Sequence, residues 1–413
     1  MGRLLRKEDV LAYAIASTAL STGGGGVGAS LEAVEKMYDD AVAKGAKPEL
    51  TDLSEVPDDV YLRAGIMTGG GVQTEMKMRW SRGGGGRLTR DSPYPRDPDA
   101  IRDKIMENDA TFCPLNTWSE IPGPDFEDQA LNRLKEITGV DKIYGSLFGE
   151  VSPGGSRRLC TASLEGMKVI DANPTGYRAV PEISITTLNL ENIKCTPAVL
   201  TTSWGDLLVL EKTLCYQRAE ELIEGIALYS GGNAGGPFLI TGREAKKAGI
   251  PGVVSFVIDI GKAILKARES GDDIIEAFLK ASKGRAYKLF EGKITRFWKD
   301  DAFTFIWGES HFKGTGNYAE HRFRIWYKNE NHISWLDDKP YVTSPDGVNV
   351  VDPKTGWGLA NFWPDEWEVG RPVVIIGVKN DERWETSMGL KLFGPQHFGF
   401  DIKHIPIDKL MKQ

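Results

Sequence analysis

The chain has 413 residues, 41% hydrophobic and 26% charged, which suits two folded units better than one. Its net charge of −7 offers no basic surface to nucleic acid or to an anionic membrane, so a small molecule is the expected partner. The four cysteines are widely spaced and form no Cys-x-x-Cys pair, which argues against a disulfide framework or a structural zinc cluster.

The first predicted element is a helix over residues 7–20, where apolar residues recur with helical spacing. Asp9 would lie near the positive end of the helix dipole. Basic residues precede this apolar run, but Glu8 and Asp9 interrupt it, and it falls short of the ~18 apolar residues of a membrane span. We therefore expect a cytoplasmic protein without membrane contact.

Four consecutive glycines, residues 23–26, end this first helix, and Ser30 is expected to cap a second helix that runs to Ala43. Each glycine costs backbone entropy, so the run implies unusual backbone angles or a close approach that side chains would prevent. Its N–H groups could bind an anion or a carbonyl oxygen. No phosphate-binding lysine follows and no strand precedes, which disfavours a nucleotide site. A substrate-binding role and a purely structural turn both stay open.

The following elements alternate as in an α/β layer. A short strand and a turn at residues 57–58 precede a buried strand over 60–67. The segment 79–128 is dense in Gly, Pro, Arg and Asp, which is typical of a mobile insertion, a lid or an interface arm. A helix is predicted over 128–139, and an apolar strand then runs into a polar loop over 169–182.

The second half of the chain contains predicted helices and then mostly strands. The pattern indicates a hairpin at 204–206, helices over 217–228, 255–270 and 273–283, and β structure from 286 onward. We predict an α/β fold in two domains: residues 1–192 form an N-terminal domain with a mixed sheet, and residues 193–413 form a C-terminal domain with helices and a β-rich terminal portion.

The loop over 169–182 is the strongest candidate for chemistry, because open α/β sheets bind ligands at the carboxyl ends of their strands. It offers Asp171, Asn173, Arg178 and Glu182. Carboxylates beside an arginine can orient water, hold a metal or bind a polar ring, although loops also carry solvated charges. The five histidines show neither HxH nor HExxH spacing, and no serine-hydrolase or kinase signature occurs. The candidate chemistry that remains uses carboxylates, water and a metal.

Several motifs, in order, resemble the S-methyl thiohydantoin desulfurase family, which is associated with hydantoinases. They include "EDVLAYAIASTALSTGGGG", "IDANPTGYRAVPE", "KNENHISW" and "WETSMGLKLFGPQHFGFDIKHIPI". The resemblance implies a two-domain hydrolase-type enzyme that acts on a five-membered cyclic amide, urea or thiourea. In the family's reaction, water replaces sulfur at the ring carbon between two nitrogens. This needs an activated water, a donor for the anionic intermediate and an acid for the leaving sulfur.

The resemblance also suggests which residues act. Asp171 and Glu182 match acidic positions of the family's loop, and Arg178 matches its arginine, so these three are the expected catalytic residues. Asp171 would activate water or bind metal, and Arg178 would orient the substrate. The expected substrate-binding residues are Thr22, Gly24, Gly25, Gly26 and Asn173. A divalent metal such as zinc could activate the water, but the family's Asp-Ala-Asp followed by glycine reads Asp-Ala-Asn-Pro here, which weakens that expectation.

A second interpretation belongs to another class of protein. The chain would then be a non-catalytic subunit of a multi-component hydantoinase- or carboxylase-like complex, with residues 79–128 as a docking arm. The first interpretation predicts turnover of a ring substrate by the chain alone, and the second predicts turnover only with a partner; a ligand-binding or regulatory protein is a third, weaker interpretation. We expect a homo-oligomer or a subunit of a larger complex. The first two interpretations place the glycine run and the acidic loop on opposite sides of one cleft.

Overall fold

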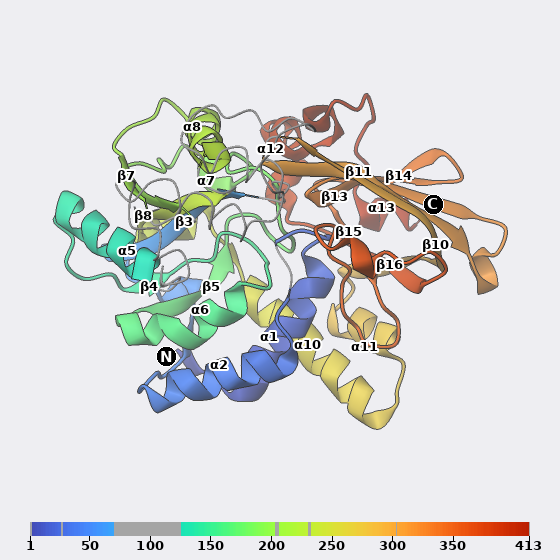
Figure 1. Cartoon of the computed structure of the whole chain (residues 1–413), viewed down its shortest axis with the longest axis horizontal. Helices are drawn as coiled ribbons and strands as arrows, with labels where there is room; N and C mark the ends of the chain where they lie inside the picture. Colours follow the sequence, from blue (N-terminus) through green and yellow to red (C-terminus); the bar gives the residue numbers. More distant parts are fainter. Residues whose placement is uncertain are drawn as a thin grey trace, which may run out of the picture.

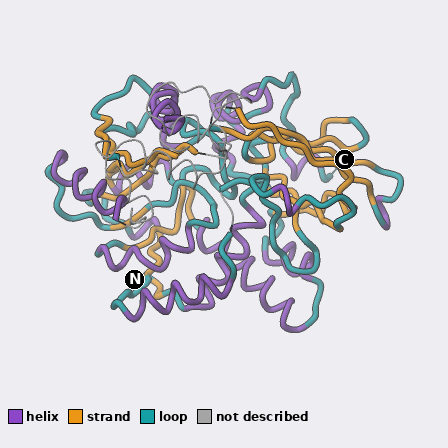
Figure 2. Tube along the Cα trace, in the orientation of Figure 1, coloured by secondary structure: helices purple, strands orange, loops and turns teal. Residues whose placement is uncertain are grey.

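The computed structural model of the protein describes residues 2–25, 28–69, 125–202, 206–229, 233–302 and 304–412. Figures 1 and 2 show two β-sheets side by side, with helices around the first sheet and along the junction. Residues 79–124 of the predicted insertion lie outside the described residues, and the role of the insertion stays a prediction.

The first sheet is mixed, as predicted. Its strand order is β1-β2-β5-β4-β3-β8-β6-β7, and β9 pairs with β5. The strands are β1 (Arg3–Leu4), β2 (Glu49–Asp52), β3 (Tyr61–Gly69), β4 (Gly145–Ser146), β5 (Lys168–Asn173), β6 (Ala198–Thr202), β7 (Leu207–Leu210), β8 (Asn233–Thr241) and β9 (Ile250–Pro251). Strands β2, β5, β4 and β3 run parallel, so their carboxyl ends lie at one edge. Antiparallel pairing of β6 with β7 confirms the predicted hairpin.

Local sequence signals set the helix ends. The helices are α1 (Lys7–Leu20), α2 (Leu31–Ala43), α5 (Asp125–Thr138), α6 (Gly155–Thr161), α7 (Thr187–Leu190), α8 (Tyr216–Tyr229), α9 (Gly242–Ala248), α10 (Val253–Ser270), α11 (Ile274–Ala281), α12 (Ser387–Phe393) and α13 (Ile407–Leu410). The Ser30 side chain accepts the Ala33 N–H and caps α2, as predicted. Asp273 caps α11 in the same way. Among the described helices, none is long and apolar enough to cross a membrane.

Helix α1 is buried over most of its length and packs along α10. Gly261 of α10 makes this close contact possible, because a Cβ there would lie 1.8 Å from the Ala12 carbonyl oxygen. The first helix therefore lies at the centre of the molecule, and its carboxyl end places the glycine run at the junction between the two sheets (Figure 1).

The second sheet is antiparallel, and its order is β14-β13-β12-β11-β10-β16-β15. Its strands are β10 (Ala286–Ala302), β11 (Phe305–Gly314), β12 (Arg322–Lys328), β13 (Glu330–Leu336), β14 (Lys339–Thr343), β15 (Gly347–Val351) and β16 (Pro372–Val378). Buried aromatic residues such as Phe290, Phe312 and Phe323 fill its core. This confirms the predicted β-rich terminal portion.

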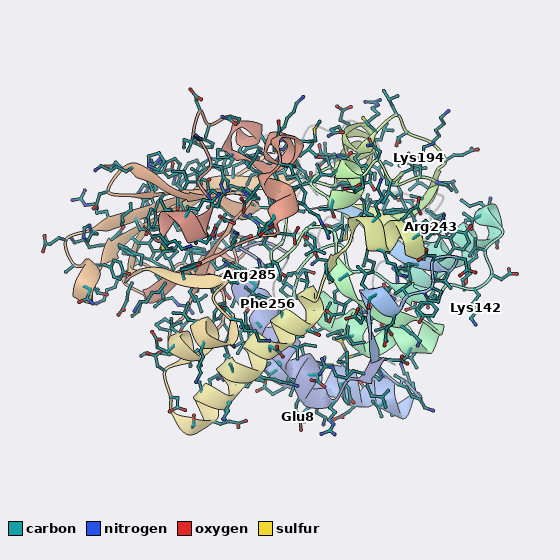
Figure 3. All side chains as sticks on the ribbon, turned by 180° about the vertical axis from the view of Figure 1, so that it is seen from behind. Glu8, Lys142, Lys194, Arg243, Phe256 and Arg285 are labelled. Atoms are coloured by element: carbon teal, nitrogen blue, oxygen red, sulfur yellow. The ribbon has the colours of Figure 1, made fainter. Side chains whose placement is uncertain are left out.

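The loop after β5 joins the two halves. The ring of Tyr177 lies 4.8 Å from the Phe256 ring on α10, and the Arg285 guanidinium lies 4.1 Å from the same Tyr177 ring. Figure 3 shows Phe256 and Arg285 close together at this junction. The domain boundary after residue 192 stays a prediction; strands β5 and β8, on either side of it, belong to the same sheet.

Candidate functional site

A cleft of about 930 Å³ opens at the carboxyl ends of β3, β4 and β5. Gly25 lines it together with the β4–α6 loop, the loop after β5 and the residues just before and at the start of β13. Ligands of open α/β sheets bind at this edge. The cleft therefore lies between Gly25, the loop after β5 and the start of β13, and is the candidate site.

The glycine run is pressed against polar side chains of the second half of the chain. A Cβ on Gly24 would lie 1.6 Å from Oε1 of Glu330, and a Cβ on Gly23 would lie 2.6 Å from Nδ2 of Asn361. Thr22, Gly23 and Gly25 have φ of 55°, 82° and 69°, in the left-handed region that favours glycine. Glu330 and Asn361 are thus the residues that approach the glycine run as closely as the sequence implies.

Thr22 is fully buried, and its N–H donates to Asn349 Oδ1 at 3.0 Å. Gly25 reaches the cleft, although its N–H donates to Glu330 Oε1 at 3.2 Å. Gly26 lies outside the described residues. The substrate-binding roles of Thr22, Gly24, Gly25 and Gly26 stay predictions, and of the described members Gly25 alone lines the cleft.

Two carboxyl groups face the cleft beside Gly25. Glu330 is 2% exposed, and its Oε2 has no hydrogen-bond partner within the part of the chain that the structure describes. Glu150, in the β4–α6 loop, accepts the Val180 N–H at 2.8 Å. Both residues line the cleft. An unpartnered buried carboxyl oxygen is costly unless the group is protonated or meets a ligand.

The surroundings of this pair favour its protonated forms. Burial raises the pKa of Glu330 well above its usual value, and the charge of Glu150 raises it further. Burial also raises the pKa of Glu150 to about 7, against the opposing effects of the Val180 N–H and of the Arg178 charge. Both carboxyl groups therefore keep a proton to higher pH than an exposed glutamate does. Such a pair can act as a general acid and a general base.

Arg178 is 1% exposed and bonds only to the protein. Its guanidinium donates to the carbonyl oxygens of Ala179, Asp346 and Asn331 at 3.1, 2.7 and 2.8 Å, and to Ser344 Oγ at 3.2 Å; Nη2 also lies 3.3 Å from His332 Nδ1. Burial lowers its pKa to about 10, which leaves it charged at neutral pH. Arg178 thus fixes the loop after β5 to the second sheet, and its predicted role in orienting substrate stays a prediction.

Glu182 lines the cleft from the same loop. One oxygen forms an ion pair with Lys328 of β12, and the other lies 2.7 Å from His397 Nε2. Burial alone would raise the pKa of Glu182, but the hydrogen bond with His397 and the charge of Lys328 lower it to about 2. Glu182 is therefore a carboxylate at all ordinary pH values, paired with Lys328 and hydrogen-bonded to His397; its catalytic role stays a prediction.

Asp171 and Asn173 lie at the base of the loop, and the described cleft wall includes neither. The two carboxylate oxygens of Asp171 accept the N–H and the hydroxyl of Ser255, in the first turn of α10. Asn173 is 1% exposed, and its Oδ1 accepts the N–H groups of Thr175 and Gly176. These contacts end β5 and shape the turn that follows. The catalytic role of Asp171 and the substrate-binding role of Asn173 stay predictions.

The divalent metal that the resemblance suggests would need several ligand side chains close together. Within residues 2–25, 28–69, 125–202, 206–229, 233–302 and 304–412, no group of three or more His, Cys, Asp or Glu side chains is arranged to hold a metal ion. Asp171 uses both oxygens on Ser255, and Glu182 uses both on Lys328 and His397. The described residues do not fit a zinc site there.

Sequence reasoning missed Glu150 and Glu330 as site residues. Glu330 lies in "KNENHISW", one of the motifs that carry the resemblance, and Glu150 lies in the stretch "GSLFGEVSPGGS". The available signal was the position of Glu150, which follows a short strand and precedes a glycine loop, as site residues of α/β proteins often do. No local signal marks Glu330.

Replacing Gly24 with Ala tests the contact between the glycine run and Glu330. The new Cβ would displace the Glu330 carboxyl group, and we expect the free energy of unfolding to fall by about 1–3 kcal/mol, the usual cost of overpacking. Gly225→Ala is the control, because nothing lies within 4 Å of its Cβ and it sits inside α8; there we expect a gain in stability of up to ~1 kcal/mol. Denaturant unfolding measures both changes. Wild-type stability in Gly24→Ala would contradict the close contact with Glu330.

Two families of domains match the chain. Residues 118–212 match the family described as S-Me-THD-like, N-terminal domain, and residues 215–407 match S-Me-THD-like, C-terminal domain. The fold is similar to that of a protein from Chromobacterium violaceum whose crystal structure is known, with a TM-score of 0.67, 15% sequence identity, and coverage of 98% of this chain and 100% of that chain. This likeness shows the fold alone. No curated protein matches the sequence significantly.

Proposed function

The chain belongs to the S-Me-THD-like family, and from this premise we propose that it is an enzyme that hydrolyses the C–S bond of a thiohydantoin-like ring with Glu150 and Glu330 as its acid–base pair. One observation carries the proposal: two carboxyl groups with raised pKa values, one of them with an unpartnered oxygen, face a cleft at the carboxyl ends of the parallel strands. Perturbed carboxyl groups in a cleft mark candidate catalytic sites.

The pair can carry both proton transfers of the reaction. The Glu150 carboxylate takes a proton from water as the water oxygen bonds to the ring carbon between two nitrogens, and the C=N π electrons move to the ring nitrogen. When these electrons re-form the double bond, the C–S bond breaks and Glu330 gives its proton to the leaving sulfur. The remaining hydroxyl proton moves to the ring nitrogen, which gives a hydantoin and a thiol. Proton transfer from Glu150 to Glu330 restores the pair.

We assign the residues of the loop after β5 to holding this arrangement. Arg178 ties the loop to the second sheet, Glu182 ties it to β12 and to His397, and Asp171 anchors the end of β5 on α10. The Arg178 charge also limits the rise in the pKa of Glu150. In this proposal the pKa of Glu150 stays close enough to physiological pH for its carboxylate to act as a base.

The test is hydrolysis of an S-methyl thiohydantoin by the purified chain alone. Thiol release is followed with a thiol reagent and hydantoin formation by chromatography, with substrate-free protein as the blank because Cys215 is exposed. We expect catalytic release of one thiol per hydantoin formed. Release only after a second protein is added would favour the non-catalytic subunit. Absence of release under both conditions would contradict the proposal.

A further inference from the structure

The wall of the cleft formed by β3 and α6 is basic. Arg63 comes from β3, and Arg157 and Arg158 come from α6; all three line the cleft. Arg63 and Arg158 both pair with Glu165, at 3.7 and 2.6 Å. These contacts hold two of the three guanidinium groups in place against the protein.

Arg157 differs from its two neighbours. Its side chain is exposed, and it forms no ion pair with any residue that the structure describes. Guanidinium groups bind carboxylates through two parallel N–H donors, with geometry that a lysine cannot match. Arg157 is therefore the cationic group of this wall that has its donors available to a ligand.

We propose that Arg157 binds a carboxylate substituent on the substrate ring, and that the enzyme prefers anionic thiohydantoins; this inference rests on the proposed function. The positions of Glu150 and Glu182, which line the cleft elsewhere, support it. A carboxylate on the substrate is repelled by ionised Glu150 and Glu182 and attracted by Arg157. The ring is thereby directed toward the acid–base pair and the substituent toward α6.

Calorimetric titration with two product analogues of nearly equal size tests the inference. The ligands are hydantoin-5-acetic acid and its neutral amide, hydantoin-5-acetamide. We expect the wild-type protein to bind the acid about tenfold more tightly than the amide, the low end of what a charge-assisted hydrogen bond supplies. Arg157→Gln should remove this preference and leave the affinity for the amide within about twofold.

Arg243→Gln is the matched control. Its side chain is 80% exposed and it does not line the cleft, and Figure 3 shows it on α9, away from the junction. This variant makes the same change in net charge and should keep the full preference for the acid. Added salt should weaken the preference of the wild-type protein and leave amide binding unchanged.

The outcomes separate this inference from the proposed function. Equal binding of acid and amide by the wild-type protein, or a preference that survives in Arg157→Gln, would overturn the inference. Neither result would contradict the proposed hydrolysis of the C–S bond. Succinate serves as a third ligand without a ring. Arg157-dependent binding of succinate without binding of either hydantoin would keep the anion site and contradict the thiohydantoin substrate. Absence of binding by all three ligands would overturn both.

Discussion

Replacement of Glu330 by Gln is expected to lower turnover about 10²- to 10⁴-fold, the usual contribution of a general acid or base. The amide has nearly the shape of the protonated carboxyl group, so its oxygen can still accept the Gly25 N–H that Glu330 accepts at 3.2 Å. It has no acidic proton to give to the leaving sulfur. The loss should appear in kcat and kcat/KM together, because the proton moves only in the transition state.

Glu366→Gln is the matched control for this variant. Glu366 is a partly buried glutamate whose pKa is also raised by burial, and it accepts the Ala360 N–H at 2.8 Å. It does not line the cleft. Both variants should unfold at nearly the wild-type temperature, and only Glu330→Gln should lose activity. Wild-type turnover in Glu330→Gln would show that Glu330 takes no part in the chemistry.

Replacement of Arg178 by Leu is expected to lower the free energy of unfolding on the order of 3–5 kcal/mol, as for other buried charges that lose a partner. The change leaves the carbonyl oxygens of Asn331 and Asp346 without their donor from Arg178. Each buried group left unpaired costs about 1–3 kcal/mol. The leucine also removes the cation that opposes the negative charge of Glu150.

Denaturant unfolding of the Arg178 variant measures this loss, with Arg243→Leu as the exposed control that should stay near wild type. Arg178→Lys keeps the charge without the planar donors and should fall between the two, which provides a measurable variant if Arg178→Leu does not fold. A residue that only orients substrate would change KM and leave stability alone. Wild-type stability in Arg178→Leu would therefore contradict the structural role assigned here.

Helix positions could be predicted from the sequence because their signals are local. Ser30 and Asp273 cap the helices that follow them through contacts within three residues. Gly139 ends α5 with φ of 68°, as the glycine after the last apolar residue predicts. Such contacts depend on neighbours in the chain, so pattern and residue type suffice to find them.

The candidate site depends on contacts between residues far apart in the sequence. For such contacts the sequence could indicate that a residue makes a close contact, but it could not identify the other residue. The glycine run predicts a close approach, but the group that approaches Gly24 is Glu330, from the other half of the chain. Asp171 lies near the end of its strand as predicted, yet its partner Ser255 lies 84 residues later. A carboxylate that caps a helix and one that activates water look alike in sequence.

Glu330 shows the same limit most clearly. The letters Asn-Glu-Asn are typical of an exposed turn, and a turn does occur there, with φ of 55° at Asn329. The burial of Glu330 follows from packing of the β12–β13 hairpin on the glycine run, which no local pattern reveals. The turn could be predicted from the sequence, and the buried acid could not.

Infrared difference spectroscopy at pH 7 tests the central claim most directly, because it detects the carbonyl stretch of a protonated carboxyl group without any substrate. The spectra to compare are those of the wild-type protein and Glu330→Gln, since burial also raises the pKa of Glu220 to about 8 and its signal must cancel. We predict that Glu330→Gln loses one protonated-carboxyl band. Loss of an ionised-carboxylate band instead would show that Glu330 is charged at neutral pH and would contradict its role as the acid.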